Sequence, residues 1–84
     1  LDLAYRAGAA GGTMPAVLSA ANEVAGEAFL QGEISFPEIT KITAGVMKEH
    51  RPASAEDIGE IIRADAWARR RAAALLGSDL RNTL

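Results

Sequence analysis

The sequence predicts an all-α fold, a small bundle of four to five helices. In residues 14–30, apolar residues recur at spacings of three and four, which is typical of a helix that buries one side. Residues that commonly begin helices precede three such segments, at Thr13, Ser35 and Ser54. No stretch of the sequence alternates apolar and polar residues as a half-buried strand does.

A short first helix is expected at the start of the chain, ending in the glycine-containing stretch 8–12. Its apolar residues are Leu1, Leu3, Ala4 and Ala7. The pair Gly11 and Gly12 should break this helix, because an interior glycine costs about 1 kcal/mol relative to alanine.

The second predicted helix covers residues 14–30 and is the central one. Thr13 can cap it through its hydroxyl, and Pro15 suits its first turn, where no backbone N–H is needed. We expect Gly32 to end it in a left-handed conformation. The predicted buried side consists of Val17, Leu18, Ala21, Val24, Ala25, Ala28 and Phe29.

The third predicted helix begins with a capping box, in which Ser35 is the cap and Glu38 reaches back to its N–H. Phe36 is expected to be the first large anchor of its buried side, which continues through Ile39, Ile42, Val46 and Met47. Pro52 should stop this helix. Positive charge near its end suits the helix dipole, and that end carries Lys48, His50 and Arg51.

The fourth predicted segment begins at Ser54 as cap, with Ile58, Ile61 and Ile62 on its apolar side. A break is favoured near Asp65, which would then cap a fifth helix from Ala66, although one unbroken helix is the alternative. Gly77 is expected to end the last helix and residues 78–84 to form a polar, frayed tail. The residues expected to face inward are Trp67, Ala68, Ala72, Leu75 and Leu76.

Composition narrows the function classes. The net charge of −2, with acids and bases interspersed, argues against a nucleic-acid partner. No apolar run approaches the roughly 20 residues of a membrane span, so no membrane partner is expected. The absence of cysteine fits a reducing compartment, and we expect a cytoplasmic protein. Because the chain enters a helical pattern without an initiator methionine, we interpret it as a fragment, residues 1–84 of a larger enzyme.

Few residues suggest a site. Asn22 and Glu23 are polar residues in an alanine-rich helix; they are either its solvated outer face or hydrogen-bonding groups toward another domain. Trp67 is a core or domain-contact anchor. The run 69–71 of three arginines is a solvated face or domain contact, with anion binding as the alternative. The stretch 11–13 is a flexible turn rather than an anion loop, and His50 has no metal-binding neighbours.

The segment GGTMPAVLSAANEVAGEAFLQGEISFPEI, together with ADAWAR at residues 64–69, closely resembles the C-terminal region of 1-deoxy-D-xylulose 5-phosphate reductoisomerases. The resemblance runs from about Ala4 to Leu76. Ser19 stands where that family more often has asparagine, which puts any hydrogen bond of that asparagine in doubt. Gly26 replaces a bulkier aliphatic residue, which suggests local loosening or the close approach of another helix.

The resemblance implies a helical C-terminal domain that braces the catalytic domain of the same polypeptide. It implies no catalytic, cofactor-binding or metal-binding residue in this chain, and possible interdomain contacts at Asn22, Glu23 and Trp67. The full-length family enzyme uses NADPH and a divalent metal, Mg or Mn, is a homodimer, and makes 2-C-methyl-D-erythritol 4-phosphate for isoprenoid biosynthesis. The alternatives are an autonomous helical protein-interaction module and a small nucleic-acid-binding domain that uses the arginines of the run 69–71.

Overall fold

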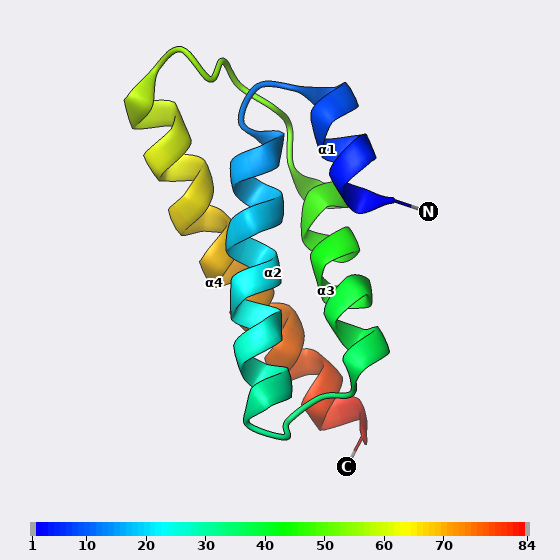
Figure 1. The fold of residues 1–84 in the computed structure, drawn as a ribbon. Helices are drawn as coiled ribbons and strands as arrows, with labels where there is room; N and C mark the ends of the chain where they lie inside the picture. Colours follow the sequence, from blue (N-terminus) through cyan, green and yellow to red (C-terminus); the bar gives the residue numbers. More distant parts are fainter. Residues whose placement is uncertain (1, 84) are drawn as a thin grey trace.

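The computed structural model describes the backbone of residues 2–83 and the side chains of residues 2–77. It contains four helices in this part of the chain, and no strand, which confirms the predicted all-α class (Figure 1). They are α1 (Leu3–Ala10), α2 (Met14–Leu30), α3 (Phe36–Glu49) and α4 (Ile58–Thr83).

Helix α2 is the centre of the bundle. It packs against α1, α3 and α4, and α3 also packs against α4, which crosses behind α2 in Figure 1. Both α2 and α4, which pack against each other, carry fully buried alanines. These alanines are Ala20, Ala21 and Ala25 of α2 and Ala68 and Ala72 of α4.

The predicted buried side of α2 is largely confirmed. Val17 is fully buried, and Leu18 and Val24 are half-buried against the core. Phe29 is the exception, since it remains 36% exposed at the edge of the bundle. The buried set also contains three residues of α2 that periodicity placed correctly, Ala21, Ala25 and Ala28.

The helix ends differ in how well the sequence predicted them. Gly32 has a φ of 77°, and the N–H of Glu33 donates to the carbonyl of Ala28 at 2.9 Å, so the left-handed end of α2 is confirmed. The side chain of Asp2 caps α1 by accepting from the N–H of Ala4, a cap that was not predicted. Thr13 was wrongly predicted to cap α2 through its hydroxyl, because that hydroxyl bonds to other parts of the chain.

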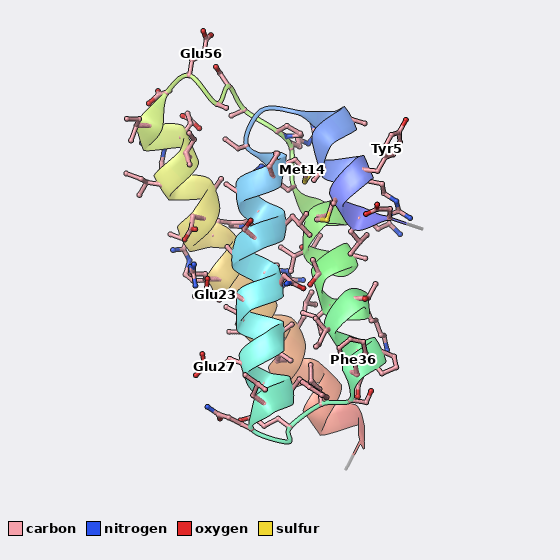
Figure 2. All side chains as sticks on the ribbon, in the orientation of Figure 1. Tyr5, Met14, Glu23, Glu27, Phe36 and Glu56 are labelled. Carbon is pink, nitrogen blue, oxygen red and sulfur yellow. The ribbon has the colours of Figure 1, made fainter. Side chains whose placement is uncertain are left out.

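The capping box at the start of α3 is confirmed, with the N–H of Ser35 donating to the Glu38 carboxylate at 2.8 Å. The expectation for Phe36 was wrong, since this side chain is 70% exposed. It lies at the foot of α3, and its ring meets the edge of the Phe29 ring at 5.5 Å between centroids (Figure 2). Phe36 is the first residue of its helix, outside the inward stripe that begins at Ile39.

Helix α4 corrects three predictions. It begins after Asp57, whose carboxylate accepts from the N–H of Gly59 at 2.8 Å, so Asp57 and not Ser54 is the cap. It runs through Asp65 without a break. It also continues past Gly77 to Thr83, so residues 78–83 are helical instead of a tail. The physical reason is a continuous inward row at a spacing of four, which keeps one helix packed: Ala64, Ala68, Ala72 and Leu76.

The first turns of α4 were expected to bury three isoleucines. Ile58 is 71% exposed and Ile62 is 61% exposed, so this expectation was wrong for both, while Ile61 is half-buried. Ile58 and Ile62 lie one turn apart on the same side of α4 and outside the row of buried alanines. They therefore form a small exposed apolar pair at the start of this helix.

Candidate functional site

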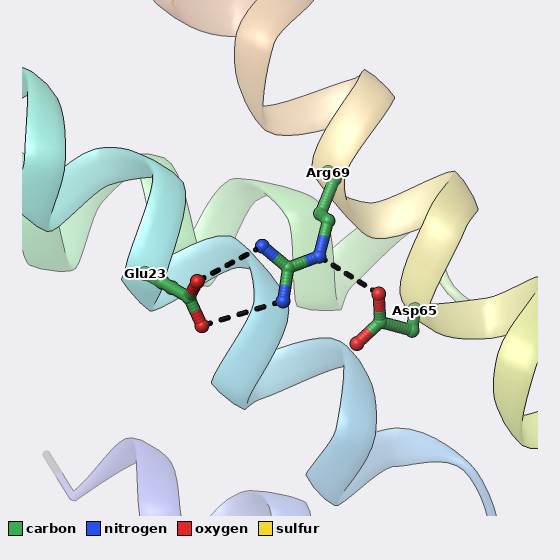
Figure 3. Close-up of polar contacts among 3 residues, drawn as sticks. All are labelled: Glu23, Asp65 and Arg69. Atoms are coloured by element: carbon green, nitrogen blue, oxygen red, sulfur yellow. Dashed lines mark hydrogen bonds and ion pairs between the residues drawn. The ribbon is translucent and has the colours of Figure 1, made fainter.

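Arg69 joins α4 to α2 through two carboxylates (Figure 3). Its Nη1 and Nη2 donate to the two oxygens of Glu23 at 3.2 and 3.3 Å, a forked contact between the helices. Its Nε donates to Asp65, one turn earlier on α4, at 2.8 Å. The hydrogen bonds to Asp65 and Glu23 raise the pKa of Arg69 above its ordinary value. Asp65 thus pairs with Arg69 one turn later on the same helix and does not cap a new helix.

The arginine run 69–71 is only partly available to anything outside the chain. Arg69 is held as described, and Arg71 donates to Glu49 of α3 at 2.8 Å. Arg70 is exposed. Arg70 therefore fits the predicted solvated face, whereas Arg69 and Arg71 join α4 to α2 and α3.

Asn22 and Glu23 lie side by side on α2 and are both exposed. The Glu23 side chain is 67% exposed even though Arg69 holds both of its oxygens. The Asn22 amide has no hydrogen-bond partner among the described residues. Glu23 is thus oriented by the bundle itself, whereas Asn22 offers two donors and an acceptor to its surroundings.

Trp67 is half-buried and packs on the core, and the centroids of its ring and the His50 ring lie 5.3 Å apart. The Nε2 of His50 lies 2.8 Å from the Thr13 hydroxyl, which also accepts from the N–H of Ala53 at 3.0 Å. A hydroxyl has one proton and two lone pairs, so the Thr13 hydroxyl can accept from the N–H of Ala53 and also form the hydrogen bond with Nε2, whose direction depends on the tautomer of His50. Burial lowers the pKa of His50, which agrees with the neutral form.

The stretch 11–13 is the turn between α1 and α2, as expected, and it also contacts the segment that follows α3. The N–H of Thr13 donates to the carbonyl of Ala53 at 2.9 Å, so this N–H is not free for an anion. Gly12 has a φ of 54°, and a Cβ there would collide with the same carbonyl. No sequence pattern predicts these contacts, because Thr13 and its partners are about forty positions apart.

Gly26 was expected either to loosen α2 locally or to let another helix approach closely. No atom lies within 4 Å of where a Cβ of Gly26 would be, so no other described helix approaches it closely.

Within the described residues, no group of three histidine, cysteine or acidic side chains is arranged to hold a metal. None of the described helices combines the length and the apolar character that crossing a membrane requires.

Comparison with known proteins identifies relatives of most of the chain. Residues 1–71 match a family model described as DXP reductoisomerase C-terminal domain. The chain is 55% identical over 75 residues to the 1-deoxy-D-xylulose 5-phosphate reductoisomerase of Moorella thermoacetica, and 53% identical over 77 residues to that of Thermodesulfovibrio yellowstonii. These alignments cover 89% and 92% of the chain but 20% of each relative.

A solved structure agrees in fold as well as in sequence. The reductoisomerase from Zymomonas mobilis, solved in complex with NADPH, superposes on this chain with a TM-score of 0.82 and 39% identity. The match covers 88% of this chain and 20% of that one. The chain therefore spans about a fifth of the length of the relatives it matches.

Proposed function

The chain belongs to the DXP reductoisomerase family, matching its C-terminal domain, and on this premise we propose that it braces the catalytic domain of a larger polypeptide. In this proposal the chain supplies no catalytic residue. The complete enzyme converts 1-deoxy-D-xylulose 5-phosphate to 2-C-methyl-D-erythritol 4-phosphate with NADPH, as a cytoplasmic homodimer. The relatives' names and the NADPH complex of the Zymomonas enzyme support the reaction and the cofactor.

The donors for NADPH and for a divalent metal, Mg or Mn, are proposed to lie in the rest of the polypeptide. Several carboxylates of this chain already have partners, since Glu23 and Asp65 both bind Arg69. Asp57 caps α4, and Glu60 pairs with Arg63 at 2.6 Å. Because these carboxylates are already paired within the bundle, they suit a structural role and do not suit the binding of a metal ion.

The observation that carries the bracing role is the exposed pair Asn22 and Glu23 on the central helix. Helix α2 contacts all three other helices, so a partner bound to α2 is tied to the whole bundle. Arg69 fixes the Glu23 carboxylate in place, which lowers the entropy that a partner must overcome when it binds there. We propose that Asn22, with the exposed side of Glu23, hydrogen-bonds to the catalytic domain, and that Trp67 adds a contact through its exposed part.

The test uses the full-length enzyme. Asn22→Ala should lower the melting temperature, because a partner left unpaired in an interface costs about 1–3 kcal/mol. The KM for NADPH should stay unchanged. Thr40→Ala, an exposed polar residue of α3, is the matched control and should change neither quantity. Loss of turnover in Asn22→Ala without loss of stability would place Asn22 in the active site and refute the bracing role.

Glu23 needs a second comparison, because Glu23→Ala also breaks the pair with Arg69. Arg69→Met breaks the same pair from the other side and also removes the bond to Asp65, so its effect is an upper limit for what loss of the pair costs within the bundle. If Glu23 contacts the catalytic domain, Glu23→Ala should lower the melting temperature of the full-length enzyme more than Arg69→Met does. Equal losses would confine Glu23 to the bundle.

The second candidate function is an autonomous protein-interaction module, which the exposed pair Ile58 and Ile62 favours. Exposed apolar side chains that are neighbours on a helix commonly mark an interaction surface. If the rest of the same polypeptide covers this pair, Ile58→Ser with Ile62→Ser should lower the melting temperature of the full-length enzyme. An unchanged melting temperature would show that the rest of the enzyme does not cover Ile58 and Ile62, which would favour the protein-interaction module.

A further inference from the structure

The chain contains two methionines and no cysteine, and both methionines line one groove. Met14 is the first residue of α2, and Met47 lies near the end of α3. The groove has a volume of about 570 Å³ and lies between α1, the start of α2 and the end of α3. Met14 lies at the upper end of α2, on the side that faces α1 (Figure 2). The fold thus gathers all the sulfur of this chain at one groove.

Both methionine side chains belong to the hydrophobic core and yet border this groove. Each of them is 7% exposed. The groove opens to solvent, and its volume is many times the roughly 30 Å³ that a water molecule occupies in the liquid. A small hydroperoxide such as hydrogen peroxide therefore fits beside these side chains without unfolding of the bundle.

The groove also offers hydrogen-bond donors to an oxidised sulfur. Arg6 of α1 and Lys48 of α3 line it, and no acidic side chain does. Both cations are exposed, and neither pairs with a carboxylate of another described residue. The sulfur of a thioether accepts hydrogen bonds only weakly. Oxidation to the sulfoxide makes the side chain polar, and its new oxygen can accept hydrogen bonds from these two cations.

We propose that Met14 and Met47 form an oxidation site that responds to hydroperoxides. The sulfur attacks the terminal oxygen of the peroxide, and the O–O bond breaks. The sulfur keeps that oxygen and is oxidised by two electrons, while the other oxygen leaves with the electron pair, takes the proton of the transferred hydroxyl and becomes water or an alcohol. The site involves none of the residues on which the bracing function rests.

Oxidation at this site loosens one end of the bundle. The sulfoxide oxygen turns toward Arg6 and Lys48 and draws the methionine side chain away from the core. A polar side chain then replaces an apolar one where α1, α2 and α3 meet, and this weakens their packing. Because methionine sulfoxide reductases reverse the reaction, the change acts as a redox-sensitive switch of stability.

Peptide mass spectrometry of the full-length enzyme treated with hydrogen peroxide measures how reactive the two methionines are. A methionine that reacts only after local opening is protected by the free energy of that opening, which slows the reaction about a hundredfold or more in a stable core. Met14 and Met47 should instead react at rates within about tenfold of their rates in denaturant. Slower reaction than this in the native enzyme would overturn the proposal.

Filling the groove tests the route of the oxidant. Ala10 lines the groove, whereas Ala9 precedes it on α1 and does not line it; both are exposed. Ala10→Leu should slow the oxidation of both methionines, because the larger side chain occupies the space beside them, and Ala9→Leu should not. Equal rates in the two variants would show that the oxidant does not enter through the groove and would refute the site.

The melting temperature of the full-length enzyme before and after peroxide treatment measures the consequence. Oxidation should lower it, and a methionine sulfoxide reductase supplied with a thiol reductant should restore it. The double variant Met14→Leu with Met47→Leu nearly conserves the core volume and should not show this loss, even where other methionines of the enzyme are oxidised. An equal loss in the double variant would assign the effect to those other methionines and overturn the switch.

Charge reversal tests the role of the cations. Lys48→Glu replaces a hydrogen-bond donor by an acceptor, so peroxide should lower the melting temperature of this variant more than that of the unsubstituted enzyme. Arg51→Glu, the same reversal at an exposed position that does not line the groove, should leave the loss unchanged. Equal losses in the two variants would refute the contact between the sulfoxide and Lys48.

Discussion

Thr13 gives the sharpest prediction about the stability of the bundle. Its side chain is 1% exposed, and its hydroxyl bonds to the His50 ring at 2.8 Å and to the Ala53 N–H at 3.0 Å. Valine has nearly the same shape, so Thr13→Val opens no cavity and removes only these two bonds. At a net value of about 0.5–1.5 kcal/mol for each bond, the variant should lose about 1–3 kcal/mol of unfolding free energy.

Thr43 supplies the matched control. It is also 1% exposed, but its hydroxyl has no hydrogen-bond partner among the described residues. Thr43→Val therefore removes a buried polar group that has no partner there, and stability should stay the same or increase. Urea unfolding of both variants, followed by circular dichroism at 222 nm, measures the difference. A Thr13→Val variant that loses no more stability than Thr43→Val would refute the role assigned to the junction of Thr13, His50 and Ala53.

Three further predictions concern the glycines, His50 and Arg69. Gly12→Ala should destabilise the chain strongly, because φ is 54° at this position and the new Cβ would collide with the Ala53 carbonyl. Gly8 lies within α1 with nothing within 4 Å of a new Cβ, so Gly8→Ala should stabilise the chain by about 0.5–1 kcal/mol. Equal melting temperatures of the two variants would contradict this. Burial lowers the pKa of His50, so as the pH falls the unfolded chain takes up the proton before the folded chain does. The free energy of unfolding should therefore decrease as the pH falls below about 6.5, and His50→Gln should lose this dependence in urea unfolding at a series of pH values. Arg69→Lys should lower the melting temperature slightly, because lysine cannot bind both oxygens of Glu23, and an unchanged value would show that the fork adds nothing.

Two local signals, at the start of α3 and at the end of α2, were predicted correctly because the groups involved are close along the chain. The capping box joins Ser35 and Glu38, three residues apart, and Gly32 ends α2 by its own backbone conformation. Asp65 shows where such signals become ambiguous. An aspartate suits both a helix cap and a pair with an arginine one turn later, and here Arg69 and a continuous row of buried alanines decide for the second.

Contacts between distant residues could not be predicted from the pattern. The hydroxyl of Thr13 suits a helix cap, yet the folded chain brings His50 and Ala53 to it from about forty residues away. Periodicity also overestimates burial at helix starts, since Phe36 is 70% exposed and Ile58 is 71% exposed. For the candidate site, the sequence singled out Asn22 and Glu23, but the binding of Glu23 by Arg69 became visible only in three dimensions.

The central claim, that this chain supplies stability and not chemistry, is tested most directly by dividing the enzyme before Leu1. NADPH oxidation with 1-deoxy-D-xylulose 5-phosphate is measured for the 84-residue chain, for the remainder of the enzyme, and for the two mixed. We expect no turnover by the chain alone, a lower melting temperature for the remainder than for the intact enzyme, and recovery of stability on mixing. Turnover by the chain alone, or a remainder as stable as the intact enzyme, would contradict it.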